Sequence, residues 1–203
     1  MKKFNSFVFL PVFFIFQSLF VFAQTDKKAE IKRVDAYCKT VDAFVKKYNG
    51  PHLVFAGISD ENENKPKWKK YNSEKEFKKA QETVGFYDIA YVWQKNGKIV
   101  MTNFTFSSAS GDWVHYVYQY FREDGTLAKV EAQLNTFYGN LTVLRDFYFN
   151  RNGKLLRKTA KYLDLKTKKP KKPDKQNFYD KEVNIFKKTN SLPFNSLLIK
   201  KRK

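Results

Sequence analysis

Five glycines recur at a constant step of fourteen residues, and this spacing constrains the fold more than any other feature of the chain. They are Gly97, Gly111, Gly125, Gly139 and Gly153. Three of them end Asn-Gly or Asp-Gly pairs between apolar runs, which is the signature of a two-residue hairpin turn. A step of fourteen corresponds to a strand of about ten residues plus a turn. Residues 86–164 are therefore predicted to form six antiparallel strands in up-and-down order.

The turn type also predicts which side chains share a face of the sheet. With two-residue turns, residues 95, 123 and 151 pair with residues 98, 126 and 154. One face then collects most of the apolar strand residues and must be covered. Polar and tyrosine side chains also fall on that face, namely Tyr87, Tyr91, His115, Gln119, Arg145, Lys158 and Tyr162.

The cover is predicted to be an N-terminal amphipathic helix over residues 29–48. Its apolar positions alternate three and four apart: Ile31, Val34, Cys38, Val41, Val45 and Tyr48. The pair Asn49-Gly50 and then Pro51 end it. Cys38, the only cysteine, lies on the apolar stripe, so we expect a buried, inert thiol rather than a nucleophile or a disulfide.

The expected fold class is α+β, with this helix packed on a six-stranded antiparallel meander that is strongly curved or a half-barrel. The domain spans residues 24–165. Within it, residues 52–58 are predicted to be a strand and residues 59–70 a polar loop. Ser73 and Glu76 have the spacing of a capping box, which starts a short helix that runs to about Thr83.

The first 23 residues have the features of a secretory signal peptide. Lys2 and Lys3 precede an apolar stretch, and Val21-Phe22-Ala23 forms a cleavage site. A membrane anchor is the competing interpretation, but Pro11 and Gln17 interrupt the stretch. We expect cleavage after Ala23 and export to the periplasm or the medium.

Basic residues dominate the C-terminal extension, residues 166–203, which holds 13 basic and 3 acidic side chains. Residues 166–175 are expected to be an extended linker, and residues 183–194 carry apolar side chains that can dock back on the domain. An anionic envelope surface is the expected partner of this tail. Only six basic residues of the whole chain are Arg, so a solvated lysine surface competes with that hypothesis and no specific nucleic-acid partner is expected.

The opposite face of the predicted sheet is expected to contact water. It carries Lys129, Glu131 and Gln133 together with a row of three tyrosines, Tyr116, Tyr118 and Tyr120. The row is either a docking surface for a partner or a set of strand tyrosines that cover lysine stems.

The leading functional hypothesis is an exported, non-enzymatic binding protein with a pocket for a small apolar or aromatic ligand between helix and sheet. Buried polar residues on the covered face would line it. A small hydrolase or isomerase with His115 as general base and Arg145 as anion clamp is the second hypothesis, and an interaction module acting through the tyrosine row is the third. No cofactor or metal site is expected, because the common nucleotide, zinc and calcium motifs are missing. The oligomeric state stays open.

Two resemblances concern architecture alone. The turns Asp124–Leu127 and Asn152–Leu155 resemble those of bacterial YD-type hairpin repeats. A helix packed on a curved antiparallel sheet is similar to the nuclear-transport-factor-like and cystatin-like folds. Neither likeness implies an activity.

Overall fold

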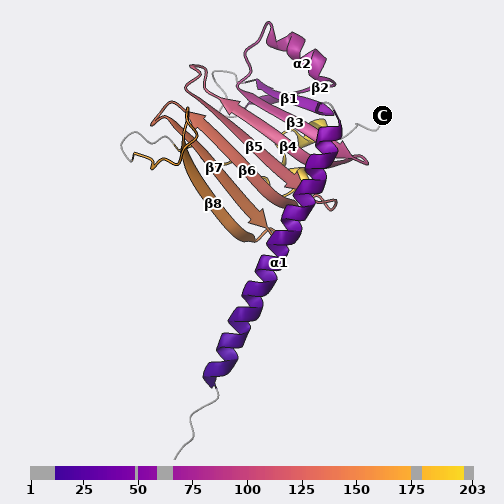
Figure 1. Cartoon of the computed structure of the whole chain (residues 1–203). Coiled ribbons are helices and arrows are strands. Elements are labelled where there is room, and N and C mark those ends of the chain that lie inside the picture. The colour runs from indigo at the N-terminus through magenta and orange to yellow at the C-terminus, as the bar shows by residue number, and fades with distance from the viewer. Residues whose placement is uncertain (1–11, 49, 59–65, 175–179, 199–203) are drawn as a thin grey trace, which may run out of the picture.

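A computed structural model of the chain describes residues 12–48, 50–58, 66–174 and 180–198, with side chains from Asp26 onward. It contains one antiparallel sheet of eight strands in the order β2-β1-β3-β4-β5-β6-β7-β8 (Figure 1). The sheet is open, with β2 and β8 at its edges. The expected α+β class is confirmed, but the six predicted strands are extended by two further strands beside β3.

The six predicted strands follow one another as a meander. They are β3 (Asp88–Lys95), β4 (Lys98–Ser107), β5 (Trp113–Phe121), β6 (Leu127–Thr136), β7 (Leu141–Phe149) and β8 (Leu155–Asp164). Next to β3 lies β1 (Leu53–Ile58), which was predicted, and then β2 (Lys67–Tyr71), which falls in the segment predicted to be a loop. The lysines of β2 made this segment look like a polar loop in the sequence. Lysines are typical of edge strands, because their charge opposes pairing with a further strand.

Helix α2 (Glu74–Gln81) confirms the capping-box prediction. The Ser73 side chain accepts a hydrogen bond from the Glu76 amide, and the Glu76 carboxylate accepts one from the Asn72 amide. Its buried residue Phe77 packs with Tyr71 and Phe86 above β1 and β2. Because the cap satisfies amides that the first helical turn leaves unpaired, this short helix has a defined start.

The long helix α1 (Val12–Lys47) crosses one face of the sheet and then extends beyond it (Figure 1). Its predicted stripe is confirmed: Val34, Cys38 and Val41 are buried against the sheet. Burial raises the pKa of the Cys38 thiol to about 12, in keeping with the expected inert cysteine. The whole of the predicted signal peptide, residues 1–23, and its cleavage site lie outside the residues whose side chains are described. Among the described residues, no helix is both long and apolar enough to cross a membrane.

The face that α1 covers is a correction to the sequence prediction. The helix packs on Met101, Tyr120 and Tyr148, on the face that was expected to contact water, and on Trp93, which was assigned to the covered face. The other face is covered instead by the C-terminal segment, whose residues Leu192 and Phe194 join the main core. The predicted docking of residues 183–194 is thus confirmed, and it takes the position that was assigned to the helix.

The register of the first hairpin explains part of the difference. Asn96 and Gly97 both have positive φ, as a two-residue turn requires, and Lys95 pairs with Lys98 as predicted. A bulge beside Trp93 then shifts the pairing by one residue, which turns Trp93 and all earlier side chains of β3 to the opposite face. Tyr87 and Tyr91 are therefore separated from the polar residues with which they were grouped.

The other two hairpins carry a similar bulge but keep the predicted register. In the second hairpin the Arg122 amide donates to the Thr126 carbonyl, so the turn has three residues instead of two. The bulge at Tyr120 shifts the register back, and His115 faces Leu134 as predicted. The predicted pairs 123–126 and 151–154 are wrong, since residues 150 and 154 pair likewise in the third hairpin. The bulges also place three residues under α1 that were assigned to the other face: Val100, Ala128 and Leu156.

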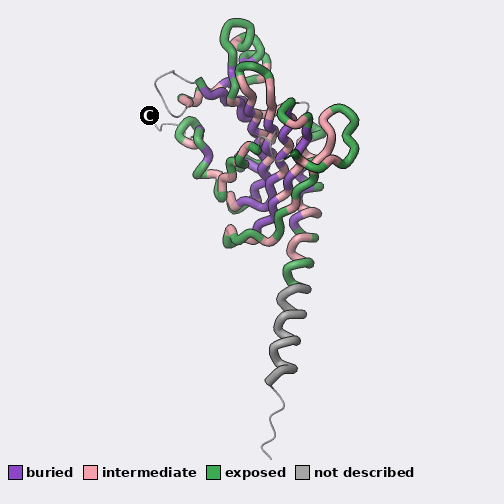
Figure 2. The backbone as a smooth tube through the Cα atoms, turned by 90° about the vertical axis from the view of Figure 1, so that its left-hand side faces the viewer, coloured by how far each residue is buried: buried purple, intermediate pink, exposed green. Residues whose placement is uncertain are grey.

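Buried residues concentrate in the strands, and exposed residues lie in the turns and loops around them (Figure 2). The four apolar clusters draw all their residues from Ile31 to Leu198. Every side chain of the described core therefore lies after the predicted cleavage site.

Candidate functional site

A cleft lies between α1 and the turns at one end of the sheet. Its deeper part has a volume of about 100 Å³ and lies between the helix and the β3–β4 turn. Its wider part, about 640 Å³, continues toward the β5–β6 and β7–β8 turns. Tyr37, Lys98 and Glu123 line both parts, so the two form one continuous cleft.

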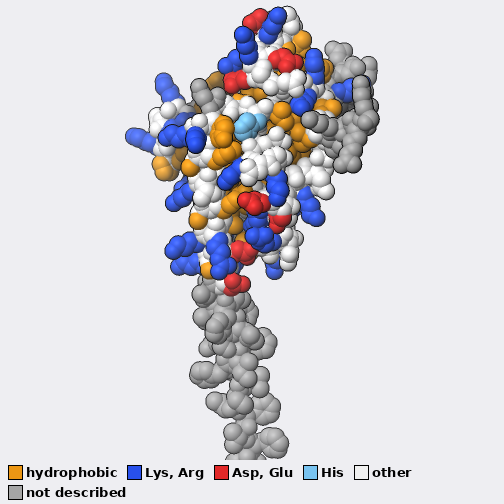
Figure 3. All heavy atoms as spheres, turned by 90° about the vertical axis from the view of Figure 1, so that its right-hand side faces the viewer, with side chains coloured by type: hydrophobic (Ala, Val, Ile, Leu, Met, Phe, Trp, Pro, Cys, Tyr) orange, Lys and Arg blue, Asp and Glu red, His pale blue; other side chains and the backbone are white. Residues whose placement is uncertain are grey.

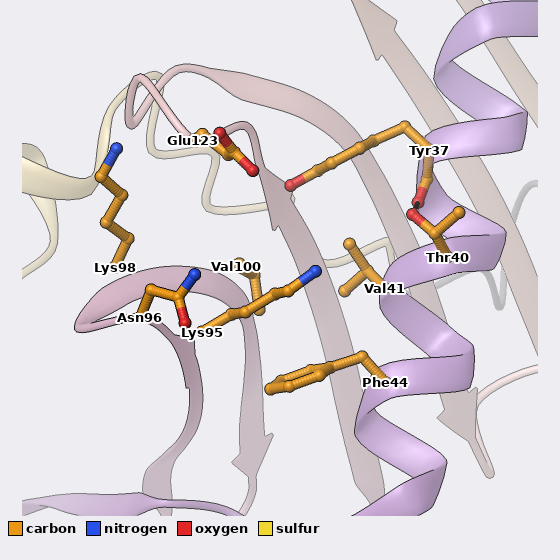
Figure 4. A pocket seen from close by; sticks show the side chains of 9 residues that line it. All are labelled: Tyr37, Thr40, Val41, Phe44, Lys95, Asn96, Lys98, Val100 and Glu123. Carbon is orange, nitrogen blue, oxygen red and sulfur yellow. Dashed lines mark hydrogen bonds between the residues drawn. The ribbon is translucent and has the colours of Figure 1, made fainter.

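The deeper part has an apolar floor with a cation above it. Val41 and Phe44 project from α1 toward Val100 of β4, and the Lys95 side chain lies across the opening (Figure 4). The Lys95 ammonium is 5.9 Å from the centre of the Phe44 ring, within the range of a cation–π contact. Such a floor accommodates an apolar or aromatic group of a ligand.

The wider part is charged and has a net positive balance. Lys98, Arg122 and Arg151 from the turns and Arg33 from α1 face Glu30, Glu123 and Asp124. Acidic and basic side chains are accordingly intermixed around the point where α1 leaves the sheet (Figure 3). Arg151 pairs with Asp124 at 3.1 Å, whereas the side chains of Arg33 and Lys98 make no ion pair or hydrogen bond with any described residue. These two cations remain available to an anionic group.

Two contacts hold the walls of the cleft in place. The Tyr37 hydroxyl donates to the Phe121 carbonyl and thereby ties α1 to the end of β5. Burial and nearby charges raise the pKa of this phenol to about 12, so it stays protonated at neutral pH. Arg122 donates to the carbonyls of Leu127 and Phe149 at 2.5 and 2.7 Å, which joins the β5–β6 turn to β7.

The polar residues predicted to line a pocket lie on the other face, under the C-terminal segment. Gln119 is fully buried; its amide donates to the Asn184 carbonyl and accepts from the Phe186 amide. Arg145 is 6% exposed and pairs with Asp180 at 2.5 Å. Both residues therefore fasten the segment to the sheet.

His115 lies on the same face but lacks the side-chain hydrogen bonds that Gln119 and Arg145 make. It is 1% exposed, and neither ring nitrogen has a hydrogen-bond partner in the described part of the chain. Burial, together with the nearby charges of Arg145 and Lys181, lowers the pKa of its imidazole to about 4. Arg145 and Lys158 line a separate cavity of about 350 Å³, but His115 does not border it. The structure thus brings His115 and Arg145 onto one face without giving them a shared open cleft.

The remaining predicted residues are scattered. Tyr87 is 45% exposed, Tyr91 packs edge-on against Phe77, and Tyr162 packs beside the small cluster at Leu134. Lys158 is exposed, with its ammonium over the Phe147 ring. Of the tyrosine row, Tyr120 is buried under α1 and donates to Asp42 at 2.9 Å, while Tyr116 and Tyr118 are half-buried.

The sequence did contain a signal for the cleft that was missed. Lys95, Glu123 and Arg151 occupy the same position of the 28-residue hairpin repeat. Charged residues at one repeat position must gather at one end of a meander, because alternate turns lie side by side. In the described residues, no cluster of three His, Cys, Asp or Glu side chains is arranged to hold a metal ion.

The fold and cleft define an α+β protein with an open antiparallel sheet and a helix-bounded groove at one end. No protein-family model matches the chain, and neither curated proteins nor solved structures give a match. The function must therefore be argued from the residues themselves.

Proposed function

We propose that the chain is an exported, non-enzymatic binding protein that holds a small amphipathic anion in the cleft beside α1. The observation that carries the proposal is the juxtaposition of an apolar floor, at Val41, Phe44 and Val100, with the two unpaired cations Arg33 and Lys98. An apolar group of the ligand would occupy the floor, and its acidic group would meet the cations. The leader sequence supports export, with cleavage after Ala23.

The ligand class follows from how the cleft is divided. The small volume of the deeper part, about 100 Å³, suits a single ring or a short branched chain rather than a long acyl chain. The wider part is open and charged, so hydration of an acidic group is retained on one side while the cations approach it on the other. Apolar ligands without an acidic group would leave Arg33 and Lys98 without a partner.

The enzymatic alternative receives less support from the packing. A general base must reach a substrate, yet His115 is sealed beneath the segment that Gln119 and Arg145 fasten. That segment would have to lift before any reaction could occur. The cleft needs no such rearrangement.

Native mass spectrometry of the protein purified from its own envelope fraction tests the proposal. The expected result is a polypeptide that starts at Gln24 and carries an extra mass that denaturation removes. Thr40→Trp places an indole at the mouth of the deeper part, because Thr40 lines it and is exposed. This variant should lose the extra mass. Arg33→Glu combined with Lys98→Glu should weaken binding of the released compound at least about tenfold.

Matched controls come from the other flank of α1. Lys39 and Lys32 are exposed and line none of the clefts described above, so Lys39→Trp and Lys32→Glu should keep the extra mass. A bare polypeptide from the unmodified protein, or an extra mass that persists in Thr40→Trp, contradicts the cleft as the binding site. A mature chain that retains residues 1–23 contradicts the export pathway.

A further inference from the structure

The end of the sheet opposite the cleft exposes two aromatic side chains at the tip of one turn. Phe137 and Tyr138 lie in the turn between β6 and β7, and they are 70% and 49% exposed. Phe137 is the most exposed of the large hydrophobic side chains in the described structure. The two neighbouring rings form a small exposed aromatic surface on this turn, which is available for a contact outside the domain.

Lysines surround this tip because the chain after β8 folds back beside it. Sequence analysis predicted an extended linker here, but residues 163–171 form a return that pairs Leu163 with Pro170. In Figure 1 this loop, in orange, lies at the same end of the sheet as the β6–β7 turn. The Lys171 ammonium donates to the carbonyls of Gly139 and Asn140 at 2.9 and 3.2 Å, so the return is attached directly to the aromatic turn.

The return is held in a defined shape. Asp164 accepts hydrogen bonds from the amides of Lys166 and Thr167, and these bonds, with that from the Thr167 hydroxyl and the contact to Lys171, lower the pKa of its carboxyl to about 2. Lys168 donates to the Thr142 hydroxyl at 2.8 Å. The lysine cluster is therefore formed before any partner arrives, which reduces the ordering cost of binding.

The charge of the return is strongly positive. Residues 164–172 contain five lysines, Lys166, Lys168, Lys169, Lys171 and Lys172, and one acidic residue, Asp164. Lys166, Lys169 and Lys172 are exposed. All the cations of the cluster are lysines, which lack the planar guanidinium group with which arginine binds a single phosphate through two hydrogen bonds. It suits a diffuse array of negative charge instead.

We infer that this end of the molecule docks on an anionic lipid bilayer, with the Phe137 and Tyr138 rings inserted among the headgroups and the lysine return lying on the charged surface. Aromatic side chains favour the membrane–water interface, and lysines near an anionic leaflet add attraction that falls within a Debye length. The two features act together because one turn and one return carry them side by side. The inference does not depend on the cleft, which lies at the other end of the strands.

Vesicle sedimentation tests it with the chain from Gln24 to Lys203. The protein should bind vesicles of phosphatidylcholine that contain one third phosphatidylglycerol, and it should bind pure phosphatidylcholine vesicles far more weakly. Phe137→Ser should lower the partition coefficient about tenfold. Lys166→Gln, Lys169→Gln and Lys172→Gln together should lower it about a hundredfold, since each lysine near the surface contributes about fivefold. High salt should reduce the second contribution and leave the first.

Two controls separate docking at this end from general basicity. Leu155→Ser removes another exposed apolar side chain, 46% exposed, at the opposite end of the strands, and Lys75→Gln with Lys79→Gln removes exposed lysines of α2. Neither variant should change binding beyond about twofold. A Phe137→Trp variant should bind as the parent does, with a blue shift of tryptophan emission on anionic vesicles.

Three outcomes would overturn the inference. One is equal binding to both vesicle types, and another is equal loss in the control variants. The third is binding to a single-stranded oligonucleotide that matches or exceeds binding to anionic vesicles and resists Phe137→Ser, which would identify a nucleic acid as the partner. Loss of the carried mass in the cleft variants, with vesicle binding unchanged, would separate this docking from the proposed ligand function.

Discussion

The two faces of the sheet are covered in different ways, although the same strands build both. Helix α1 covers one face with a continuous stripe, and its flank adds polar contacts such as Tyr120 to Asp42 and Tyr148 to Asp35. The C-terminal segment covers the other face with single anchors, above all Phe194, which is fully buried and stacked on Phe55 at 4.1 Å. A regular helix distributes its contacts, whereas an irregular segment depends on a few side chains.

The contrast extends to polar groups. Under α1, burial favours the neutral form of Lys129, yet its bonds to Glu131 and Tyr148 prevail and raise the pKa of its ammonium. Under the C-terminal segment, His115 is buried without such bonds. Asp35 of α1 also lies 3.5 Å from the Lys129 ammonium, whereas the irregular segment brings Lys181, a further cation, near the imidazole.

The largest expected effect concerns the anchor of the C-terminal segment. Phe194→Ala should lower the free energy of unfolding by about 3–5 kcal/mol, because it removes a fully buried ring that also contacts Phe104 and Trp68. Urea titration measures the change. Leu197→Ala, in the same segment but 39% exposed, serves as control and should cost less than about 1 kcal/mol. Equal effects of the two variants would show that the segment does not work through single anchors.

The next largest effect is the dependence of the free energy of unfolding on pH, which involves His115. The imidazole has a pKa of about 4 in the folded chain and near its usual value of 6.5 when unfolded. The unfolded chain therefore binds more protons between these values, and the free energy of unfolding should fall as the pH drops from 6.5 to 4, by about 3 kcal/mol. Below pH 4 this contribution no longer changes.

Urea titrations across this range, for the parent protein and for His115→Gln, measure that dependence. The variant should lack the part of the pH dependence that the imidazole supplies. If both proteins lost stability in parallel between pH 6.5 and 4, other groups would be responsible. The lack of hydrogen-bond partners for His115 would then have no effect on stability.

The smallest effect is expected under α1. Tyr120→Phe should cost about 1 kcal/mol, because it removes one hydrogen bond to Asp42, which is itself exposed to water. Tyr116→Phe is the matched control on the same strand and face, and thermal unfolding should hardly distinguish it from the parent. A loss of more than about 3 kcal/mol for Tyr120→Phe would mean that α1 also depends on a single anchor.

Local patterns predicted the elements well. The stripe from Ile31 to Val45, the Ser73 cap and the glycine turns each depend on interactions within a few residues. The structure confirms the stripe, the cap and the positions of the turns, although two of the turns have three residues instead of two. A pocket between helix and sheet was predicted, but none of the residues predicted to line it borders this cleft. Its residues come from three turns and a helix, and no local pattern states which face that helix covers.

By itself, the sequence determined the helix, the six-stranded meander, the buried cysteine and the concentration of charge in the tail, because periodicity and turn chemistry act over short distances. Only the tertiary structure decided which cover lies on which face. A one-residue bulge turns the earlier part of β3 over, and two apolar segments compete for two apolar faces. The packing of the whole chain decides which segment covers which face. The aromatic side chains of the C-terminal segment pack on the face that is rich in Phe. The carboxylates of α1, Asp35 and Asp42, meet Lys129 and Tyr120 on the other face.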